Sequence, residues 1–359
     1  MLNVRTAVRD LPAYRPPLGG RTGLRLDFNE NVVGCSPRVL NRLRSLGAEE
    51  LARYPEREPV EQAVANYLQV SAQELLLTNG VDEAIHLLCE AYLDTGDEAL
   101  IVVPTFAMYE ILARATGAGI TQIPADADFS FPTQTVLRHI SPKTRLIAIA
   151  NPNNPTGSVA TIEDLLLIAK SAPDAALLVD EAYYEFHGET AMGKWAERPT
   201  VFVARTFSKA YGLAGLRAGI LMGHPQQIAM IRKLASPYNV NAIALACLPD
   251  ALGDQHYVDN YVREVRSGRC LLEKELGRCG IPFWPSRANF VLMRLGQANS
   301  TFISKMRERG ILVRDRSRDP GCEGCVRITL GSMEQTERLL PILKLTLEEI
   351  GAIREGARS

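Results

Sequence analysis

Short apolar runs alternate with helix-like segments through the middle of this chain. The apolar runs are predicted to be strands, at residues 99–103, 146–150, 175–179, 200–204 and 216–222. Helix-like segments lie among them, at residues 84–93, 106–115 and 162–172. Strands that are apolar throughout are typical of a parallel sheet with helices on both faces. The alternation therefore predicts an α/β fold with a mostly parallel central sheet flanked by helices.

The C-terminal third of the chain has a different pattern. Predicted helices at residues 262–278, 302–309 and 335–353 are mixed with predicted strands at residues 289–294, 311–314 and 326–330. This mixture indicates a smaller α+β domain with a boundary near residue 255. The first 45 residues have too little apolar content to fold alone, so we expect them to pack on the C-terminal part. The expected domains are residues 46–255 and residues 1–45 plus 256–359.

Composition narrows the class of protein. The chain has 359 residues, 46% of them hydrophobic, which is enough for two domains. Its net charge of −1 produces no overall field that would attract nucleic acid or an acidic membrane. Residues 1–17 lack the apolar core of a signal peptide, and no apolar run approaches the length of a membrane span. We therefore expect a cytoplasmic protein without a nucleic-acid or membrane partner.

Seven cysteines are scattered through the chain, and an odd number is typical of reduced thiols in a cytosolic protein. Cys322 and Cys325 form the one close pair. A zinc site normally needs a second pair or nearby histidines, and none of the five histidines is close to them in the sequence. An ordinary turn before a strand is the favoured interpretation, and we expect no metal site.

Polar residues gather where the predicted strands end, which is the edge at which open α/β sheets bind ligands. The first cluster is residues 78–83, directly before a predicted helix. Gly80 allows a tight turn, and the N–H groups at the helix start suit a phosphate. The alternative is a plain helix cap in which Asp82 and Glu83 satisfy the first turn.

Two further clusters follow neighbouring strands. Residues 151–157, Asn-Pro-Asn-Asn-Pro-Thr-Gly, form a rigid turn rich in amides that suits a polar ring substituent, or serves only as a structural turn. Asp180 ends an apolar strand, where a carboxylate is costly unless it pairs with a cation. A protonated ring nitrogen is one such cation, and a structural arginine is the other. Tyr183 adds a phenol nearby.

The last cluster contains Lys209, which follows an apolar run and precedes small residues and glycines. A lysine in such a setting can form a Schiff base with an aldehyde or ketone. Ser208 and Arg217 flank it and could bind a phosphate. Taken singly, Lys209 could be a salt-bridged structural lysine and Arg217 a surface arginine. Together, the clusters provide an aldehyde acceptor, a phosphate site, a carboxylate for a ring nitrogen and partners for a ring hydroxyl, which are the needs of pyridoxal phosphate.

The chain resembles the fold-type I pyridoxal-phosphate aminotransferases of class I/II, and within them the histidinol-phosphate aminotransferases. The matching segments run in order along nearly the whole chain, at residues 28–31 (Phe-Asn-Glu-Asn), 53–55 (Arg-Tyr-Pro), 80–83, 104–109, 152–157, 180–183, 205–210 (Arg-Thr-Phe-Ser-Lys-Ala), 212–217 and 326–331. The lysine segment and the Asn-Asn-Pro-Thr-Gly turn are specific for the superfamily. The Asn-Glu-Asn and Arg-Tyr-Pro segments indicate the subfamily.

The resemblance implies a role for each matching residue. Lys209 would form the Schiff base with pyridoxal 5'-phosphate and then act as general base and acid. Asp180 would bind the pyridinium nitrogen, keeping the cofactor an electron sink. Asn154 and Tyr183 would bind the ring oxygen, and Phe106 would stack on the ring. The phosphate would be bound by Gly80, Val81, Thr206, Ser208 and Arg217. Arg327, Asn29 and Tyr54 would bind substrate. Tyr54 would also reach the phosphate of the partner subunit's cofactor, in a homodimer with shared active sites.

The implied reaction is a ping-pong amino transfer from glutamate, with histidinol phosphate and imidazole acetol phosphate as the other pair. An aromatic amino acid aminotransferase and a lyase similar to threonine-phosphate decarboxylase are the alternatives.

Two departures from the family pattern stand out. Phe106 replaces a common tyrosine, and residues 32–34, Val-Val-Gly, lack the usual proline. The second change lies near the substrate in relatives and bears on substrate identity.

Overall fold

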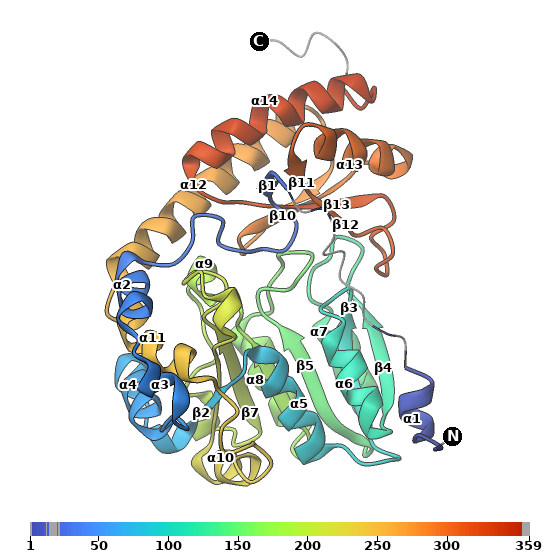
Figure 1. The fold of residues 1–359 in the computed structure, drawn as a ribbon. Coiled ribbons are helices and arrows are strands. Elements are labelled where there is room, and N and C mark those ends of the chain that lie inside the picture. Colours follow the sequence, from blue (N-terminus) through green and yellow to red (C-terminus); the bar gives the residue numbers. More distant parts are fainter. Residues whose placement is uncertain (1, 12, 14–19, 21, 354–359) are drawn as a thin grey trace.

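The structure is a computed structural model, and it describes residues 2–11, 13, 20 and 22–353. Figure 1 shows a large sheet with helices around it and a smaller layered part above its upper edge. The large sheet has seven strands in the order β2-β8-β7-β6-β5-β3-β4. Their bounds are β2 Leu75–Thr78, β3 Glu98–Val103, β4 Gly119–Pro124, β5 Thr144–Ala150, β6 Ala176–Asp180, β7 Val201–Thr206 and β8 Gly219–Gly223.

The large sheet is mostly parallel, as the apolar runs predict. Only β8, among the strands of this sheet, runs antiparallel to its neighbours β2 and β7. The other pairs are parallel, so the carboxyl ends of β2, β3, β5, β6 and β7 meet at one edge. This shared edge brings together the polar residues that follow these strands.

Helices cover both faces of the large sheet. One face packs against α5 (Val81–Tyr92), α6 (Met108–Thr116) and α10 (Pro225–Ile231), and the other against α7 (Thr133–His139) and α8 (Ile162–Ser171). In β6, Leu177 and Val179 belong to one apolar core and Leu178 to the other. Successive side chains of a strand point to opposite faces, so a strand covered on both sides must be apolar throughout.

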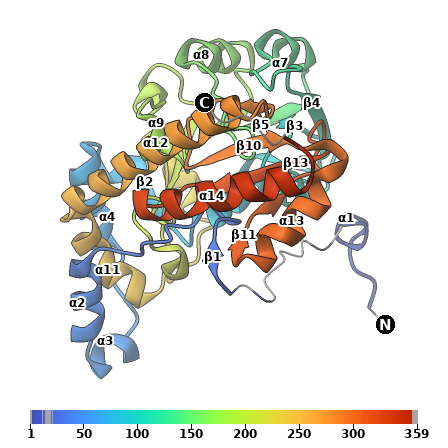
Figure 2. The same cartoon turned by 90° about the horizontal axis from the view of Figure 1, so that it is seen from above.

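The smaller part contains a four-stranded sheet in the order β12-β13-β10-β9. The strands are β9 (Phe283–Trp284), β10 (Phe290–Arg294), β12 (Arg314–Asp315) and β13 (Cys325–Thr329), and the neighbouring pairs are antiparallel. The helices of this part are α12 (Gln255–Arg278), α13 (Asn299–Glu308) and α14 (Met333–Glu349). Figure 2 shows α12 and α14 lying side by side across the small sheet. This arrangement is the smaller α+β layer expected from the sequence.

The N-terminal segment contacts both parts of the molecule. Strand β1 (Leu24–Arg25) pairs in parallel with β11 (Ile311–Leu312) of the smaller part, as expected. Helix α2 (Pro37–Ser45) instead packs on α11 (Ala242–Leu252), because its buried Val39 matches the apolar face of that helix. The other helices are α1 (Thr6–Arg9), α3 (Ala48–Ala52), α4 (Glu58–Leu68) and α9 (Tyr184–His187), with 3-10 turns η1 (Ala72–Glu74), η2 (Lys194–Ala196), η3 (Ala214–Leu216) and η4 (Gly296–Ala298).

Several boundaries differ from those predicted. The strand expected at residues 216–222 begins only at Gly219, because η3 and a left-handed Arg217 precede it. The strand expected at residues 311–314 is two short strands in different sheets, β11 and β12. Helix α12 begins at Gln255 rather than at residue 262. This start coincides with the predicted domain boundary, and the division into two domains stays a prediction. In the described part of the chain, no helix combines the length and apolarity needed to cross a membrane.

Candidate active site

The start of α5 combines a glycine turn with an arginine. Gly80 caps the helix with a positive φ of 75°, and Val81 is the first helical residue. A Cβ atom at Gly80 would lie 2.6 Å from Nη2 of Arg217, so only glycine leaves room for that guanidinium. Arg217 Nη2 donates to Oδ2 of Asp82 at 3.0 Å. The structure therefore places Arg217 beside the N–H groups that open α5, as an anion site requires.

The end of β7 adds two hydroxyls to this place. Thr206 ends the strand, and its Oγ1 accepts a hydrogen bond from the Ser208 N–H at 3.1 Å. Ser208 is 5% exposed, and its buried Oγ has no hydrogen-bond partner among the described residues. A buried hydroxyl without a partner is costly, so a ligand oxygen there would be stabilised.

Asp180 lies at the carboxyl end of β6 and is 5% exposed. Its Oδ2 accepts a hydrogen bond from the Tyr109 hydroxyl at 2.5 Å, and its Oδ1 accepts one from the Ala182 N–H at 3.0 Å. Burial raises the pKa of Asp180 to about 6, although both hydrogen bonds lower it. The carboxylate is thus held in place by two donors and favours a cationic partner.

Tyr183 and Asn29 form a second buried pair. The Tyr183 hydroxyl accepts a hydrogen bond from Asn29 Nδ2 at 2.8 Å, and burial raises the pKa of this phenol. Asn29 is 1% exposed and has a positive φ of 55°. Its Oδ1 accepts a hydrogen bond from the Thr329 hydroxyl at 3.0 Å. Asn29 therefore reaches the site through Tyr183, and the substrate-binding role expected for it stays a prediction.

Lys209 projects toward the N-terminal segment. Its Nζ donates a hydrogen bond to the carbonyl oxygen of Phe28 at 3.2 Å. Burial, together with the positive charges of Arg327 and Arg217, lowers the pKa of Lys209 to about 8, although Glu30 and Asp82 oppose this shift. An amine with such a pKa is partly neutral near physiological pH, which proton transfer requires.

Arg327 lies in the middle of β13 and is 4% exposed. Its guanidinium donates to Oδ1 of Asn154 and, at 2.7 Å, to the carbonyl oxygen of Asp27. Burial, together with the charge of the nearby Arg316, lowers the pKa of Arg327 to about 9. The contact with Asn154 joins the small sheet to the asparagine-rich turn after β5.

The two predicted aromatic residues have different surroundings. Phe106 is partly buried and meets Tyr109 edge-on, with 5.8 Å between the ring centroids, so it lies beside the partner of Asp180. Tyr54 is 78% exposed and stacks on Tyr238 with ring centroids 4.3 Å apart. The structure thus brings Phe106 next to the site, and it does not bring Tyr54 there within the same chain.

Comparisons with known proteins agree with this geometry. The profile of the family described as aminotransferase class I and II matches residues 21–343. A histidinol-phosphate aminotransferase of Nostoc sp. is 34% identical over 349 residues, covering 96% of this chain and 97% of the relative. The chain belongs to the class I and II aminotransferases. It is a pyridoxal-phosphate-dependent aminotransferase of fold type I.

Solved structures of aminotransferases and their relatives share the fold. The histidinol-phosphate aminotransferase of Sinorhizobium meliloti, in complex with pyridoxal-5'-phosphate, superposes with a TM-score of 0.85. It is 24% identical, with 96% of this chain and 98% of that chain covered. The L-threonine-O-3-phosphate decarboxylase of Porphyromonas gingivalis has a TM-score of 0.79 at 24% identity, covering 90% of this chain and 99% of that chain. Similarity at this level shows the fold.

The residues of this aminotransferase fit its cofactor. The buried Ser208 hydroxyl without a partner, the N–H groups after Gly80 and the Arg217 guanidinium together suit a phosphate. Asp180 suits a protonated ring nitrogen, because its buried carboxylate has hydrogen-bond donors but needs a cation. Lys209 supplies an amine with a lowered pKa.

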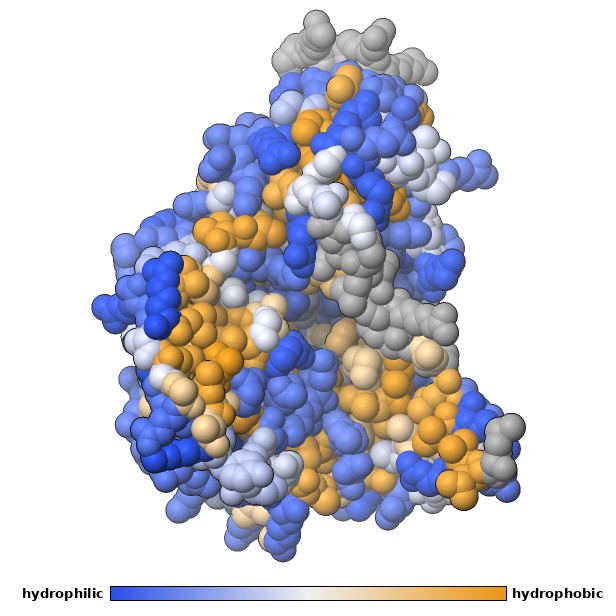
Figure 3. Space-filling view, viewed as in Figure 1, coloured by the Kyte–Doolittle hydropathy of each residue, from blue (hydrophilic) through white to orange (hydrophobic). Residues whose placement is uncertain are grey.

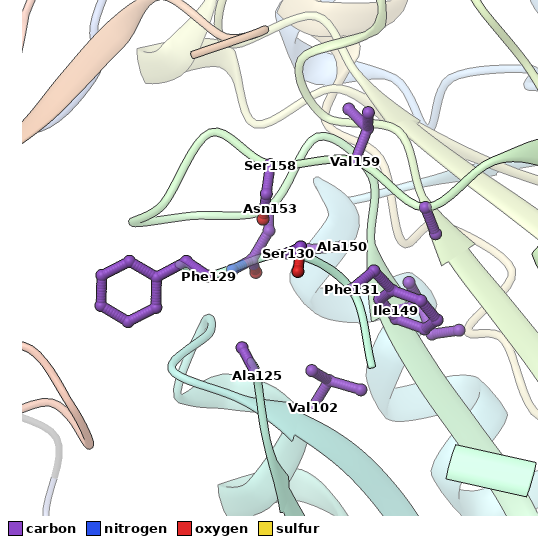
Figure 4. Close-up of a pocket in the computed structure, with 11 residues that line it drawn as sticks. Val102, Ala125, Phe129, Ser130, Phe131, Ile149, Ala150, Asn153, Ser158 and Val159 are labelled. Carbon is purple, nitrogen blue, oxygen red and sulfur yellow. The ribbon is translucent and has the colours of Figure 1, made fainter. Parts of the chain in front are cut away.

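A small cavity lies behind the asparagine-rich turn of this aminotransferase, and Figure 4 shows the residues that line it. Its volume is about 20 Å³, and Phe131, Ile149 and Asn153 line it. Such a volume holds about one water molecule, so this cavity is separate from substrate binding. Figure 4 also shows the Phe129 ring pointing away from the other side chains, and it meets Trp284 of the smaller part.

Tyr109 is a site residue that the sequence analysis did not single out. It lies within the matching segment 104–109, and it is buried and bound to Asp180. The sequence feature that could have indicated it is a tyrosine in the first turn of the helix after β3, one turn from Phe106.

Cys322 and Cys325 are both buried and form a tight turn before β13, in which the Cys325 N–H donates to the Cys322 carbonyl oxygen at 2.8 Å.

Proposed function

We propose that this aminotransferase transfers an amino group between histidinol phosphate and 2-oxoglutarate, yielding imidazole acetol phosphate and glutamate, as a step of histidine biosynthesis. Support comes from its curated relatives, such as the Nostoc sp. protein, which carry that activity in their names at 34% identity over nearly the full chain. The observation that carries the proposal is the buried Arg327 beside Lys209, since both substrates of this reaction are anionic.

Pyridoxal 5'-phosphate, when bound, supplies the electron sink that makes a proton on the substrate α-carbon acidic. Asp180 would bind its ring nitrogen, Asn154 and Tyr183 would bind its ring oxygen, and Phe106 would stack on the ring. Its phosphate would be held by the residues at the start of α5 and the end of β7, namely Gly80, Val81, Thr206, Ser208 and Arg217. Their positions at one sheet edge support this assignment.

Lys209 is the residue that moves the proton. Its Nζ accepts the proton from the substrate α-carbon and returns it to a different atom, which requires the amine to be neutral at that moment. Burial and the charges of Arg327 and Arg217 hold its pKa at about 8, so a useful fraction is neutral at pH 7 to 8. Arg327 binds the anionic group of glutamate and then that of the phosphate ester.

The assembly proposed is a homodimer in which Tyr54 binds the cofactor phosphate of the partner subunit. Tyr54 is 78% exposed, and Leu40 of α2 and Leu51 of α3 are exposed as well. Figure 3 shows apolar side chains gathered on the side of the molecule with α2, α3 and α11. Exposed apolar surface of this kind marks a protein interface. We place the enzyme in the cytoplasm, in keeping with its seven free cysteines.

The test is a single half-reaction followed by the absorbance of the bound cofactor. The holoenzyme is mixed separately with histidinol phosphate, glutamate, phenylalanine and threonine phosphate. We expect histidinol phosphate and glutamate to convert the cofactor to its amine form fastest. Faster conversion by phenylalanine would favour an aromatic amino acid aminotransferase, and release of carbon dioxide from threonine phosphate without an acceptor would favour the lyase.

A further inference from the structure

Two arginines lie directly opposite each other on the small sheet. Arg314 of β12 and Arg327 of β13 are partners in the antiparallel register. Cross-strand partners have neighbouring side chains on the same face, and like charges at such positions repel each other. Arg314 also lies over the Phe28 ring, with 5.0 Å between its guanidinium carbon and the ring centroid. The pair therefore lies at the segment whose carbonyl oxygen accepts a hydrogen bond from Lys209.

Arg316 adds a third positive charge to this face. Its N–H donates to the Cys325 carbonyl oxygen at 3.0 Å, so the ladder between β12 and β13 continues to this residue. Residues two apart in a strand point to the same side, which places Arg316 on the side of Arg314. Its charge lowers the pKa of both Arg327 and Tyr183, as expected for a neighbour of the site.

These three guanidinium groups have unused hydrogen-bond donors. The buried atoms Arg314 Nη1, Arg316 Nε and Arg327 Nε have no hydrogen-bond partner among the described residues. Arg316 is nevertheless paired, since its Nη2 contacts a carboxylate oxygen of Asp319. Burial raises the pKa of Asp319, while the charges of Arg316, Arg327 and Arg314 lower it. Asp319 is therefore a partly buried carboxylate that contacts Arg316 and feels the charges of Arg327 and Arg314.

Asp319 lies in a segment of successive turns. Its N–H donates to the Arg316 carbonyl oxygen at 3.0 Å, and its own carbonyl oxygen accepts from the Cys322 N–H at 3.0 Å. The backbone of the turn is thus held by bonds that do not involve the carboxylate. The side chain of Asp319 is 26% exposed and that of Arg316 is 13% exposed. The carboxylate can therefore turn toward water without breaking the backbone bonds of the turn.

We propose that Asp319 is a displaceable counter-ion, which holds Arg316 in the site and gives it up to a phosphate ester but not to a carboxylate. A phosphate ester carries more charge than a carboxylate and three terminal oxygens, so it can accept hydrogen bonds from Arg314, Arg327 and Arg316 together. A carboxylate has two oxygens and is satisfied by Arg314 and Arg327. This inference rests on the proposed function, and it makes Arg316 a specificity-determining residue and Asp319 a positioning residue.

The first experiment compares the holoenzyme variants Arg316→Gln, Arg316→Lys and Arg318→Gln. Arg318 is exposed in the same segment, so its change removes the same charge outside the site. With histidinol phosphate, we expect Arg316→Gln to raise KM at least about tenfold with little change in kcat, since a charge-assisted hydrogen bond is lost. The glutamate half-reaction and turnover of unphosphorylated histidinol should stay close to wild type. Arg316→Lys should recover part of the loss.

A uniform loss of kcat with all three substrates would overturn the proposal, because it would show that Arg316 only supports the fold. The same KM change in Arg318→Gln would overturn it too, because a general charge effect would then suffice.

The second experiment uses inorganic phosphate and does not depend on histidinol phosphate. Phosphate is tested as an inhibitor of the glutamate half-reaction. We expect Asp319→Asn to bind phosphate several-fold more tightly than wild type, because Arg316 is then free. In the Arg316→Gln background, Asp319→Asn should have no effect, since the two residues act as a pair. Equal inhibition of wild type and Asp319→Asn by phosphate would contradict the counter-ion role. Failure of wild type to react with histidinol phosphate would contradict only the proposed function.

Discussion

At the residue scale, the chemistry of the site depends on charges removed from water. Arg327 is buried and Lys209 partly buried, and removal from water lowers the pKa of both side chains. Their positive charges also repel each other, which keeps the lysine amine closer to neutrality than in water. The lowered pKa of Lys209 is thus caused both by its removal from water and by the positive charges of neighbouring arginines.

Replacing Lys209 with alanine tests its proposed role directly. We expect kcat to fall by at least about a hundredfold, because a positioned acid or base contributes that much. The variant should keep its fold and still bind the cofactor non-covalently. The exposed Lys233 provides a control, and Lys233→Ala should match wild type. Full activity in Lys209→Ala would show that another group moves the proton.

Asp180 makes the stability of the cofactor-free protein depend on pH. Its pKa is raised from 3.8 to about 6 by burial, so between these values the native state binds more protons than the unfolded state. Stability therefore falls as pH rises through this window. We expect Asp180→Asn to remove that fall and to be more stable than wild type at pH 7 by about 1–3 kcal/mol. Urea unfolding at pH 4 and pH 7 gives the free energy of unfolding of wild type and Asp180→Asn at each pH. The same change in this free energy between the two pH values for both proteins would contradict the prediction.

Some residues of the site can be predicted from the sequence immediately around them, whereas others come together only through long-range packing. Asp180, Lys209 and the turn at residues 151–157 follow predicted strands directly, so strand prediction alone brings them to one edge. Tyr109 reaches Asp180 from a helix 71 positions away in the sequence, and Asn29 meets Thr329 across 300 positions. Contacts of this kind depend on how the helices and the N-terminal segment pack, which no local pattern specifies.

At the element scale, the start of α5 depends on the glycine at position 80. Gly80 has φ 75° and ψ 175°, a combination that essentially only glycine adopts, and a Cβ there would also lie 2.6 Å from Nη2 of Arg217. Gly193 is left-handed, with φ 82° and ψ −12°, and nothing lies within 4 Å of a Cβ there. Gly193 therefore serves as a control for a positive φ without a neighbouring arginine.

Gly193→Ala should lose roughly 1 kcal/mol of stability from its left-handed backbone, and Gly80→Ala roughly 1–3 kcal/mol, because its backbone conformation is less accessible to alanine. Only Gly80→Ala should also weaken binding of pyridoxal phosphate, because its methyl group displaces Arg217. Thermal unfolding gives the first quantity, and titration of the cofactor-free protein gives the second. Equal cofactor affinity in both variants would show that Arg217 does not hold the phosphate.

The strands that sequence analysis predicted are those buried on both faces. The two edge strands of the large sheet, β2 and β4, are not among the predicted strands. Most residues of β4, such as Thr121 and Gln122, are partly or fully exposed, whereas β2 is buried but only four residues long. The pair β11 and β12 was read as one strand, since a change of sheet leaves no mark in an apolar run. An apolar run in the sequence indicates a buried segment, so it predicts a strand only where the buried segment is also a strand.

At the scale of the whole molecule, Tyr54 lies outside the site of its own chain. We expect Tyr54→Phe to dimerise normally but to lose cofactor faster on dialysis, because the hydroxyl no longer reaches the partner's phosphate. Refolding a mixture of Lys209→Ala and Tyr54→Ala chains should yield more activity than either parent, since hybrid dimers contain one intact site. An active monomer in sedimentation would rule out a shared site.

The close contact between Gly157 and Ser286 has a mechanical consequence. A Cβ at Gly157 would lie 2.2 Å from Oγ of Ser286, and the Gly157 carbonyl oxygen accepts a hydrogen bond from the Arg287 N–H at 2.9 Å. This contact joins the large-sheet part to the smaller part of the molecule. It lies only three residues from Asn154, whose Oδ1 accepts a hydrogen bond from Arg327. If the smaller part rotated about this contact, α14, which lies at the far end of that part, would move more than Arg327 (Figure 1). We expect such a rotation to leave the hydrogen bond between Arg327 and Asn154 in place.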